Sequence, residues 1–416
     1  MSRSVYAVAT MDTKGHELAY VAERLRAAGV PVVTVDVGTM EPPVATPDVS
    51  REEVVSCHPT AEGRAATLSR SDRGVAITAM SEALMRFLLG EHRAGKVAGV
   101  IGIGGSGNTA LLAPAMQALP VGMPRLMVST IASGNVAPYV GTSDIFMLYP
   151  VVDVAGINAV SRRVLGNAAH AMAGLVTHAI PTGGEKRTIA MTMFGVTTLC
   201  VTAVRQALEA VGLDALVFHA TGTGGRAMEK LVEAGLVQGV LDITTTEVAD
   251  EVVGGILPAG PARFDAILQA RLPYVLSLGA LDMVNFGAIE TVPAAFRQRR
   301  LYVHNAQVTL MRTTPEENRR FARWIAAKLN RAEAPFTLLI PEGGVSALDA
   351  LGQPFFDPGA DAALFDELEA SIEPLPGRSI RRLPWNINDL AFAQALVAAY
   401  LELDQKAVRS TQENPR

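Results

Sequence analysis

The chain has 416 residues, of which 49% are hydrophobic and 19% are charged, and its formal net charge is -5. This length allows two or three domains, and the hydrophobic fraction can fill more than one core. A mildly acidic chain has no general attraction for nucleic acid, so we expect no nucleic-acid partner. The two cysteines, Cys57 and Cys200, form no C-x-x-C pair, which argues against a zinc site or a disulfide framework and fits a reducing cytoplasm.

Residues 97–124 carry no charged side chain, but glycines and prolines interrupt this stretch, so we expect no membrane span. The N-terminal residues MSRSVYAVATMDTKG lack the apolar segment and the cleavage site of a secretory signal. Together with the cysteine usage, these features predict a cytoplasmic protein.

Short apolar segments that end in small polar residues alternate with longer helical patterns, which is typical of parallel α/β units. In the first half of the chain, strands are expected at residues 5–10, 31–37, 97–103 and 125–130. Helices are expected at residues 16–28, 74–94, 107–119 and 157–178. The segment 38–73 is rich in proline, serine and charge, and we expect it to be a long excursion with some local structure.

The polar stretch PTGGEKR, residues 181–187, separates a long helix from a fresh β-like run and predicts a boundary between residues 1–182 and 183–416. After it, strands are expected at 188–195, 215–221, 239–245, 274–279, 301–306 and 336–343. Helices are expected at 198–211, 225–235, 261–271, 315–331 and 360–371. No strand follows the last helical pattern, 388–404, so it could pack on either half.

A glycine-rich turn lies in VAGVIGIGGSGNT, residues 97–109, between an expected strand and an expected helix. Free backbone N–H groups and the positive end of a helix favour an anion there. Residues 102–109 have the spacing of a P-loop, but Asn108 stands where the lysine belongs. They also fit G-x-G-x-x-G, yet the next strand ends in Ser129 and Thr130 rather than in an acid. We therefore interpret the turn as one wall of a composite phosphate site.

In open parallel sheets, ligands bind beyond the carboxyl ends of the strands. Three expected turns at this edge carry small polar residues, namely Asp12, Thr13 and Lys14; Gly104, Gly105, Ser106, Gly107, Asn108 and Thr109; and Ser129, Thr130, Ser133, Gly134 and Asn135. Hydroxyls and free amides from three turns predict a triphosphate pocket, with positive charge from Lys14 and Mg²⁺ on Asp12 or Asp144. The alternatives are structural: a turn that only lets a helix pack closely, a surface lysine, and N-capping by Asp12.

The second half carries the more reactive side chains. His219 and His304 end expected strands and are candidate acid–base residues, although a histidine in such a position is more often structural. Arg312, near an expected helix start, suits a carboxylate or phosphate. Thr314 is expected to cap the helix that begins at Pro315. Since the sequence holds neither a G-x-S-x-G elbow nor a spaced histidine pair, standard hydrolase chemistry is not supported.

A second glycine-rich turn keeps a dinucleotide open as an alternative ligand. Gly222, Gly224 and Ala227 fit G-x-G-x-x-A, and Glu247 lies 20 positions after Ala227. An acid at about that distance holds the ribose hydroxyls of NAD in dinucleotide-binding folds.

Nine stretches, taken in order, resemble one family over nearly the whole chain. They are ATMDTKGHE, GIGGSGNT, VSTIASGNVAPYVG, AMTMFGVTT, FHATGTGGRAME, LGALDMVNFG, HNAQVTLMRTT, PEGGVSALD and INDLAFA. They are similar to the ATP-binding N-terminal region of tomato mosaic virus resistance proteins and to its bacterial homologues. The resemblance implies two Rossmann-like, three-layer α/β subdomains with mainly parallel sheets, ATP bound by the first of them, and a homodimer.

We therefore expect an ATP-dependent enzyme that acts on a small acidic or polar metabolite in a cleft between the subdomains. In this hypothesis Mg²⁺ accompanies ATP, and His219, His304 and Arg312 lie near the substrate. Two alternatives stay open: a non-catalytic binding module that ATP regulates, and an NAD(P)-dependent enzyme that uses the second glycine turn.

Overall fold

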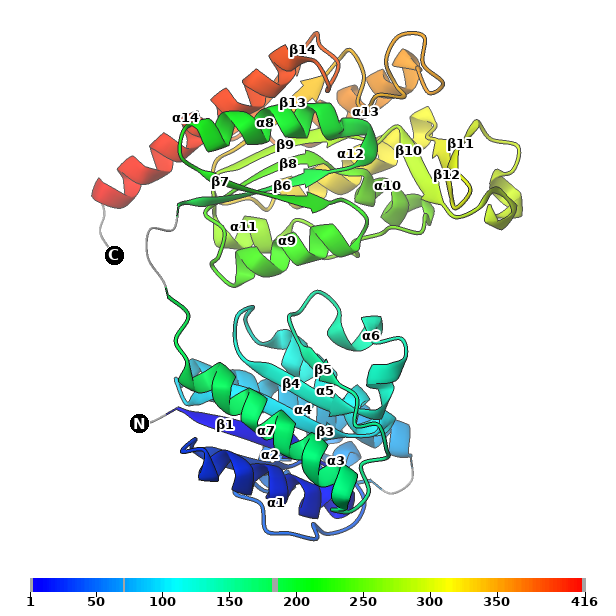
Figure 1. Cartoon of the computed structure of the whole chain (residues 1–416). Coiled ribbons are helices and arrows are strands. Elements are labelled where there is room, and N and C mark those ends of the chain that lie inside the picture. The colour runs from blue at the N-terminus through cyan, green and yellow to red at the C-terminus, as the bar shows by residue number, and fades with distance from the viewer. Residues whose placement is uncertain (1–2, 70–71, 182–185, 414–416) are drawn as a thin grey trace. The chain divides into compact units, whose positions relative to one another are not determined.

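The structure is a computed structural model that describes residues 3–69, 72–181 and 186–413. The chain forms two compact units, Met1–Gly183 and Gly184–Arg416, each built around its own parallel sheet (Figure 1). Both units are Rossmann-like, because helices cover both faces of each sheet, and the predicted fold class is confirmed.

The first unit contains a five-stranded parallel sheet. In spatial order its strands are β2 (Val32–Asp36), β1 (Ser4–Ala9), β3 (Val97–Gly104), β4 (Arg125–Ser129) and β5 (Phe146–Leu148). The central strand β3 is buried almost throughout, as expected for a parallel strand that is covered on both sides. From β1 the chain builds β2 on one side and then crosses to β3 on the other, so the winding reverses between β1 and β3.

Two groups of helices cover this sheet. One face carries α1 (Met11–Ala27) and α7 (Ala159–Thr177), and the other carries α4 (Arg73–Arg93) and α5 (Ser106–Ala118), with α2 (Arg51–Ser56), α3 (Ala61–Thr67) and α6 (Ala137–Val140) packed beside them. In α1, Leu18, Val21 and Leu25 are fully buried at helical spacing and face the sheet. Helix α7 begins with a capping box in which Asn158 and Ser161 satisfy each other's backbone N–H groups.

The second unit repeats this topology with one more strand. In spatial order its parallel sheet runs β7 (Asp214–His219), β6 (Thr188–Met193), β8 (Gly239–Thr244), β9 (Tyr274–Gly279), β13 (Phe336–Pro341) and β14 (Arg378–Leu383). As in the first unit, the second strand in sequence lies at an edge, the first lies beside it, and the later strands follow in order. The shared order is consistent with an internal duplication.

Helices α8 (Thr198–Ala210) and α14 (Leu390–Glu413) cover one face of the second sheet. The other face carries α9 (Thr223–Glu233), α10 (Thr246–Val253), α11 (Asp265–Ala270), α12 (Pro315–Leu329) and α13 (Pro358–Ser371). A separate antiparallel sheet runs β10 (Met283–Phe286), β12 (Val308–Arg312) and β11 (Leu301–Asn305). The final helix of the chain therefore packs on the second unit's own sheet.

The elements expected from the sequence are present, with several differences. The strand expected at 301–306 forms over Leu301–Asn305, but it belongs to the antiparallel sheet, and the short strands β5, β10, β12 and β14 were not expected. Helix α1 begins at Met11 rather than near residue 16, so Asp12 to Lys14 lie in its first turn. Among the described residues, no helix combines the length and the apolar character that a bilayer crossing needs.

Candidate functional site

The candidate site lies at the carboxyl edge of the first sheet, where its winding reverses. Ligands of doubly wound sheets bind in the crevice at this point. Helices α1 and α5 both begin there, on opposite faces of the sheet. A cavity of about 190 Å³ at this edge is lined by Thr10, Asp12, Thr13, Thr39, Met40, Glu41, Arg73, Ile77, Gly107, Asn108 and Leu111. These residues come from the ends of β1 and β2 and from the starts of α1, α4 and α5.

The glycines of the β3–α5 turn have different tasks. A Cβ on Gly102 would lie 2.5 Å from Cδ2 of Leu112, so this glycine lets α5 pack closely on β3. Gly104 has a φ of +155°, and a Cβ there would lie 2.7 Å from Cβ of Asn108. Gly105 and Gly107, in contrast, would meet nothing closer than 3.8 Å and 3.6 Å. Close packing therefore explains Gly102 and Gly104, whereas Gly105 and Gly107 leave open space in which a ligand could approach the backbone.

The start of α5 offers N–H donors to the cavity. Its N-cap is Gly105, and no described side chain caps the helix. Asn108, which is 6% exposed, donates its Nδ2 to the Ile103 carbonyl, while its Oδ1 has no hydrogen-bond partner among the described residues. Asn108, at the position of a P-loop lysine, therefore stabilises the turn and leaves an unpaired acceptor beside the cavity.

Asp12 and Asp36 lie at the neighbouring ends of β1 and β2. The Oδ2 of Asp12 accepts the N–H of Met40 at 3.3 Å, and its Oδ1 is buried without a described partner. Asp36 is fully buried, its Oδ1 accepts the N–H groups of Met11 and Gly38, and its Oδ2 has no described partner. Burial raises the pKa of Asp36 from its usual value. The N-cap of α1 is Thr10, so the capping role considered for Asp12 is wrong.

Lys14 does not line the cavity. Since α1 begins at Met11, Lys14 lies on the α1–α7 side of the sheet, and its Nζ donates to the carbonyl of Val154. Arg73 supplies the positive charge instead: its Nη2 is 3.6 Å from the point where a Cβ on Gly107 would lie. No sequence motif marks Arg73 as a site residue, although Asp72 before it caps α4 by accepting the N–H groups of the next turn.

The turn after β4 divides into buried and exposed parts. The hydroxyls of Thr109 and Ser129 are fully buried and lie 2.6 Å apart, so they join α5 to β4. Thr130 lies beside Gly105, with 3.8 Å between its Oγ1 and a Cβ on that glycine. The three remaining predicted residues, Ser133, Gly134 and Asn135, are exposed and do not line the cavity. Ser106 is exposed in the first turn of α5.

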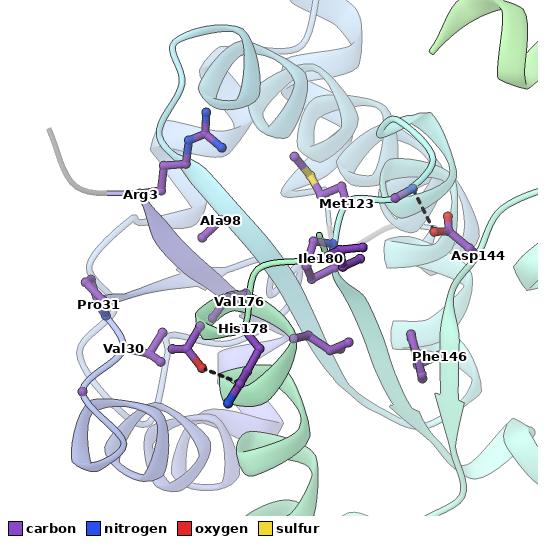
Figure 2. A pocket seen from close by; sticks show the side chains of 15 residues that line it. Arg3, Val30, Pro31, Ala98, Met123, Asp144, Phe146, Val176, His178 and Ile180 are labelled. Carbon is purple, nitrogen blue, oxygen red and sulfur yellow. Dashed lines mark hydrogen bonds between the residues drawn. The ribbon is translucent and has the colours of Figure 1, made fainter. Parts of the chain in front are cut away.

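Asp144 lies at the opposite edge of the sheet and cannot share a site with Asp12. It precedes β5, pairs with the fully buried Arg125 and accepts the N–H of Gly122 (Figure 2). The cavity there, about 600 Å³, is lined mainly by apolar groups such as Met123 and Phe146. Asp144 is therefore not a candidate Mg²⁺ ligand for the site at the carboxyl edge. No cluster of three or more His, Cys, Asp or Glu side chains that could hold a metal ion occurs in the described ranges.

The second glycine turn is already filled by a carboxylate of the same unit. Glu247 is 1% exposed, and its Oε1 accepts the N–H groups of Gly222 at 2.7 Å and Gly225 at 3.0 Å. Its Oε2 accepts Nε of Arg263 at 2.9 Å. Glu247 thus occupies the position that a pyrophosphate would need, and the dinucleotide alternative loses its geometric support.

Arg312 is 3% exposed and holds a buried charge cluster together. It pairs with Asp361 at 2.7 Å and Asp349 at 3.3 Å, and it donates to the carbonyl of Phe355. The expectation that Arg312 binds substrate is corrected by this burial, because its guanidinium is already occupied. Thr314 caps α12 in a capping box with Glu317, as predicted.

The cluster makes the second unit's stability depend on pH. Burial, together with Asp282 and Asp361, raises the pKa of Asp349 from 3.8 to about 9. A carboxyl whose pKa is raised on folding stabilises the fold fully below its unfolded pKa, and this stability is lost as the pH rises through the folded pKa. We expect the free energy of unfolding to fall from about pH 5 to about pH 8, by at most about 1.4 kcal/mol per pH unit for this group. Asp349→Asn should flatten the fall in urea titrations; parallel curves for both proteins would contradict this account.

His219 and His304 are both exposed and lie on different sheets. The ring of His219, at the end of β7, makes an edge-to-face contact with Phe194 at 5.6 Å between ring centroids. His304 lies on β11 of the antiparallel sheet. No hydrogen bond or ring contact joins the two histidines in the described part of the chain, so the structure does not bring them together as an acid–base pair.

Comparison with known proteins places the chain in a family. The N-terminal domain description of the uncharacterised protein family UPF0261 matches residues 3–181, and the C-terminal domain description matches residues 186–404. The chain belongs to the UPF0261 family. A family member from Rhizobium meliloti is 55% identical over 96% of this chain and 99% of its own length.

The plant relative is longer than this UPF0261 chain. The ToMV resistance protein Tm-1(GCR237) of Solanum lycopersicum is 47% identical over 98% of this chain but over only 56% of its own length. Among solved structures, a thioesterase domain from the curacin biosynthetic pathway covers 53% of this chain with 11% identity and a TM-score of 0.28, too low to relate the two folds. The family resemblance expected from the ordered motifs is thus confirmed.

Proposed function

We propose that the first unit binds ATP with Mg²⁺ at the carboxyl edge between β1 and β3. The observation that carries the proposal is a single cavity at the winding reversal, lined by the uncapped start of α5 and by Arg73. Helix N-termini and guanidinium groups are both suited to phosphate oxygens. The choice of ATP among nucleoside triphosphates follows the family resemblance.

The charges of the cavity suit a metal–phosphate complex. Arg73 and the positive end of α5 favour the phosphates, whereas the carboxylates of Asp12 and Glu41 would repel them unless a cation lies between. Mg²⁺ is usually held by one or two carboxylates together with phosphate oxygens and water. Asp12 is therefore the metal ligand of the proposal.

The size of the cavity indicates which part of the nucleotide it could hold. Its volume of about 190 Å³ is below the roughly 300–1,000 Å³ of small-molecule sites. The phosphates would fill it, and the nucleoside would extend over the exposed turn that begins at Thr130, next to Gly105. In this arrangement Ser133, Gly134 and Asn135 contact the nucleoside rather than the phosphates.

Gly107→Val should abolish ATP binding without unfolding the unit. The atoms nearest to a Cβ on Gly107 are Nη2 of Arg73 at 3.6 Å and Cδ1 of Ile77 at 3.9 Å, so valine would fit but would fill the cavity and displace the guanidinium. Calorimetric titrations with ATP, ADP, AMP, NAD and NADP, each with and without Mg²⁺, measure the loss and the specificity. Gly174→Val in α7, where nothing lies within 4 Å of a Cβ, is the matched control. ATP binding by both variants alike, or no ATP binding by the unmodified protein, would reject the proposal.

Of the two functional classes, binding module and enzyme, we favour a binding module that ATP regulates. The arginine expected at the substrate is buried in a charge cluster, and the second glycine turn is filled by Glu247. An enzyme that acts on a small acidic metabolite stays the competing proposal, and ATP turnover over a panel of carboxylic acids tests it. A homodimer, which the resemblance implies, is tested by sedimentation equilibrium with and without ATP.

A further inference from the structure

Two carboxylates face each other across Gly38, at the ends of β1 and β2. A Cβ on Gly38 would lie 3.1 Å from Cγ of Asp12 and 3.1 Å from Oδ1 of Asp36. The two side chains come from different elements, since Asp12 lies in the first turn of α1 and Asp36 is the last residue of β2. Parallel pairing, with Ala9 opposite Asp36, brings these ends together. Glycine at position 38 leaves the space between them open.

Each carboxylate carries one buried oxygen without a described partner. These are Oδ1 of Asp12 and Oδ2 of Asp36, and Asp36 is fully buried. A buried carboxylate oxygen that makes no hydrogen bond is costly, and a second carboxylate nearby adds repulsion. Arg51 exerts an electrostatic effect that lowers the pKa of Asp36, but its Nη1 donates to the carbonyl of Glu41 and its Nε donates to Glu52. The pair therefore lacks a cation bonded to its free oxygens.

A third buried oxygen without a described partner belongs to a residue that lines the cavity. Oδ1 of Asn108 has no described partner, and Asn108 and Asp12 both line the cavity. Two carboxylates and an amide are hard oxygen donors, which suit Mg²⁺ or Mn²⁺ rather than zinc. Two carboxylates also balance the charge of one divalent cation.

We propose that Asp12 and Asp36 together bind one divalent cation of the Mg²⁺ or Mn²⁺ type, and that they bind it in the absence of nucleotide. This inference deepens the proposed function, because the cation would lie where the phosphates enter, but its carboxylate pair is complete without ATP. Water fills the remaining coordination positions, with Asn108 on the cavity side. Asp36, which does not line the cavity, thus becomes a metal ligand that the motifs alone did not predict.

Mn²⁺ titration of the full chain, followed by the electron paramagnetic resonance signal of free Mn²⁺, tests this inference without ATP. We expect one site, and we expect Asp36→Asn and Asp12→Asn each to weaken it by about tenfold or more. Asparagine at position 36 can still accept the N–H groups of Met11 and Gly38 through Oδ1, so the fold should persist. Gly38→Ala keeps both carboxylates but places a methyl group between them, and it should weaken Mn²⁺ as well.

Asp153→Asn, which changes an exposed carboxylate outside the cavity, is the control and should leave Mn²⁺ affinity unchanged. If the unmodified chain binds no Mn²⁺, or if folded Asp36→Asn binds it as well as the unmodified chain, the inference is overturned and the pair shares a proton instead. Calorimetry with ATP separates the two proposals. Mn²⁺ binding without ATP binding would reject only the proposed function, and Mg·ATP binding that survives Asp36→Asn, without Mn²⁺ binding alone, would reject only the metal pair.

Discussion

Arg73→Ala is expected to weaken ATP binding by about 1.5–3 kcal/mol, roughly 10- to 150-fold, which is the range for a hydrogen bond to a charged group. The guanidinium lies beside Gly107 at the cavity, and among the described residues no other lysine or arginine lines it. Alanine is a good helix former, so the start of α4 should persist with Asp72 as its cap. Isothermal titration calorimetry at a fixed salt concentration measures the change.

The matched control for this variant is Arg86→Ala. Arg86 lies on the same helix, is exposed and pairs with Glu82 one turn away. Its loss should leave ATP affinity unchanged, because exposed pairs contribute little and Arg86 is outside the cavity. Lys14→Ala should also have little effect on affinity, since Nζ of Lys14 binds the Val154 carbonyl. A larger loss in Lys14→Ala than in Arg73→Ala would contradict the placement of the phosphates.

Arg263→Met is expected to lower the free energy of unfolding of the second unit by about 3–5 kcal/mol, as for other broken buried ion pairs. Arg263 is 3% exposed and pairs with Asp242 at 2.7 Å, Glu247 at 2.9 Å and Glu229 at 3.2 Å. Methionine fills a similar volume but leaves three buried carboxylates without their cation. Glu247 would then lose one of the contacts that hold it at the glycine turn of α9.

Chemical denaturation that follows the two units separately tests this expectation. The tryptophans, Trp324 and Trp385, both lie in the second unit, so their fluorescence reports its unfolding. Arg271→Met is the control, because Arg271 forms an exposed pair with Glu333 that should contribute no more than about 1 kcal/mol. Equal losses in Arg263→Met and Arg271→Met would show that the buried network stabilises the unit no more than the exposed pair does.

The sequence alone predicts the parts of the candidate site that come directly after one strand. The β3–α5 turn and the residues after β1 lie at the carboxyl edge because parallel strands all end there. Asp144 was misplaced for a definite reason: β5 has only three residues, Phe146–Leu148, and was not recognised. A residue that precedes a parallel strand lies at the amino edge, so the missed strand put Asp144 at the wrong end of the sheet.

Other parts of the site depend on contacts between elements that are distant in sequence. Arg73 reaches Gly107 because α4 packs beside α5, and no motif records that packing. Glu247 has the sequence spacing of a ribose-binding acid, yet in the fold its carboxylate accepts the backbone N–H groups of the glycine turn itself. Arg312 is the last residue of β12 in the antiparallel sheet, a strand that was not expected, and this position buries its side chain. Local patterns thus predict strand ends well, but they do not predict which side chains meet there.

A crystal structure of the chain with Mg²⁺ and a non-hydrolysable ATP analogue tests the central claim most directly. The account predicts phosphate density between Arg73 and the N–H groups of Gly107 and Asn108, with the metal against Asp12. Phosphates bound at the Gly222–Gly225 turn, or in the cavity beside Asp144, would contradict it.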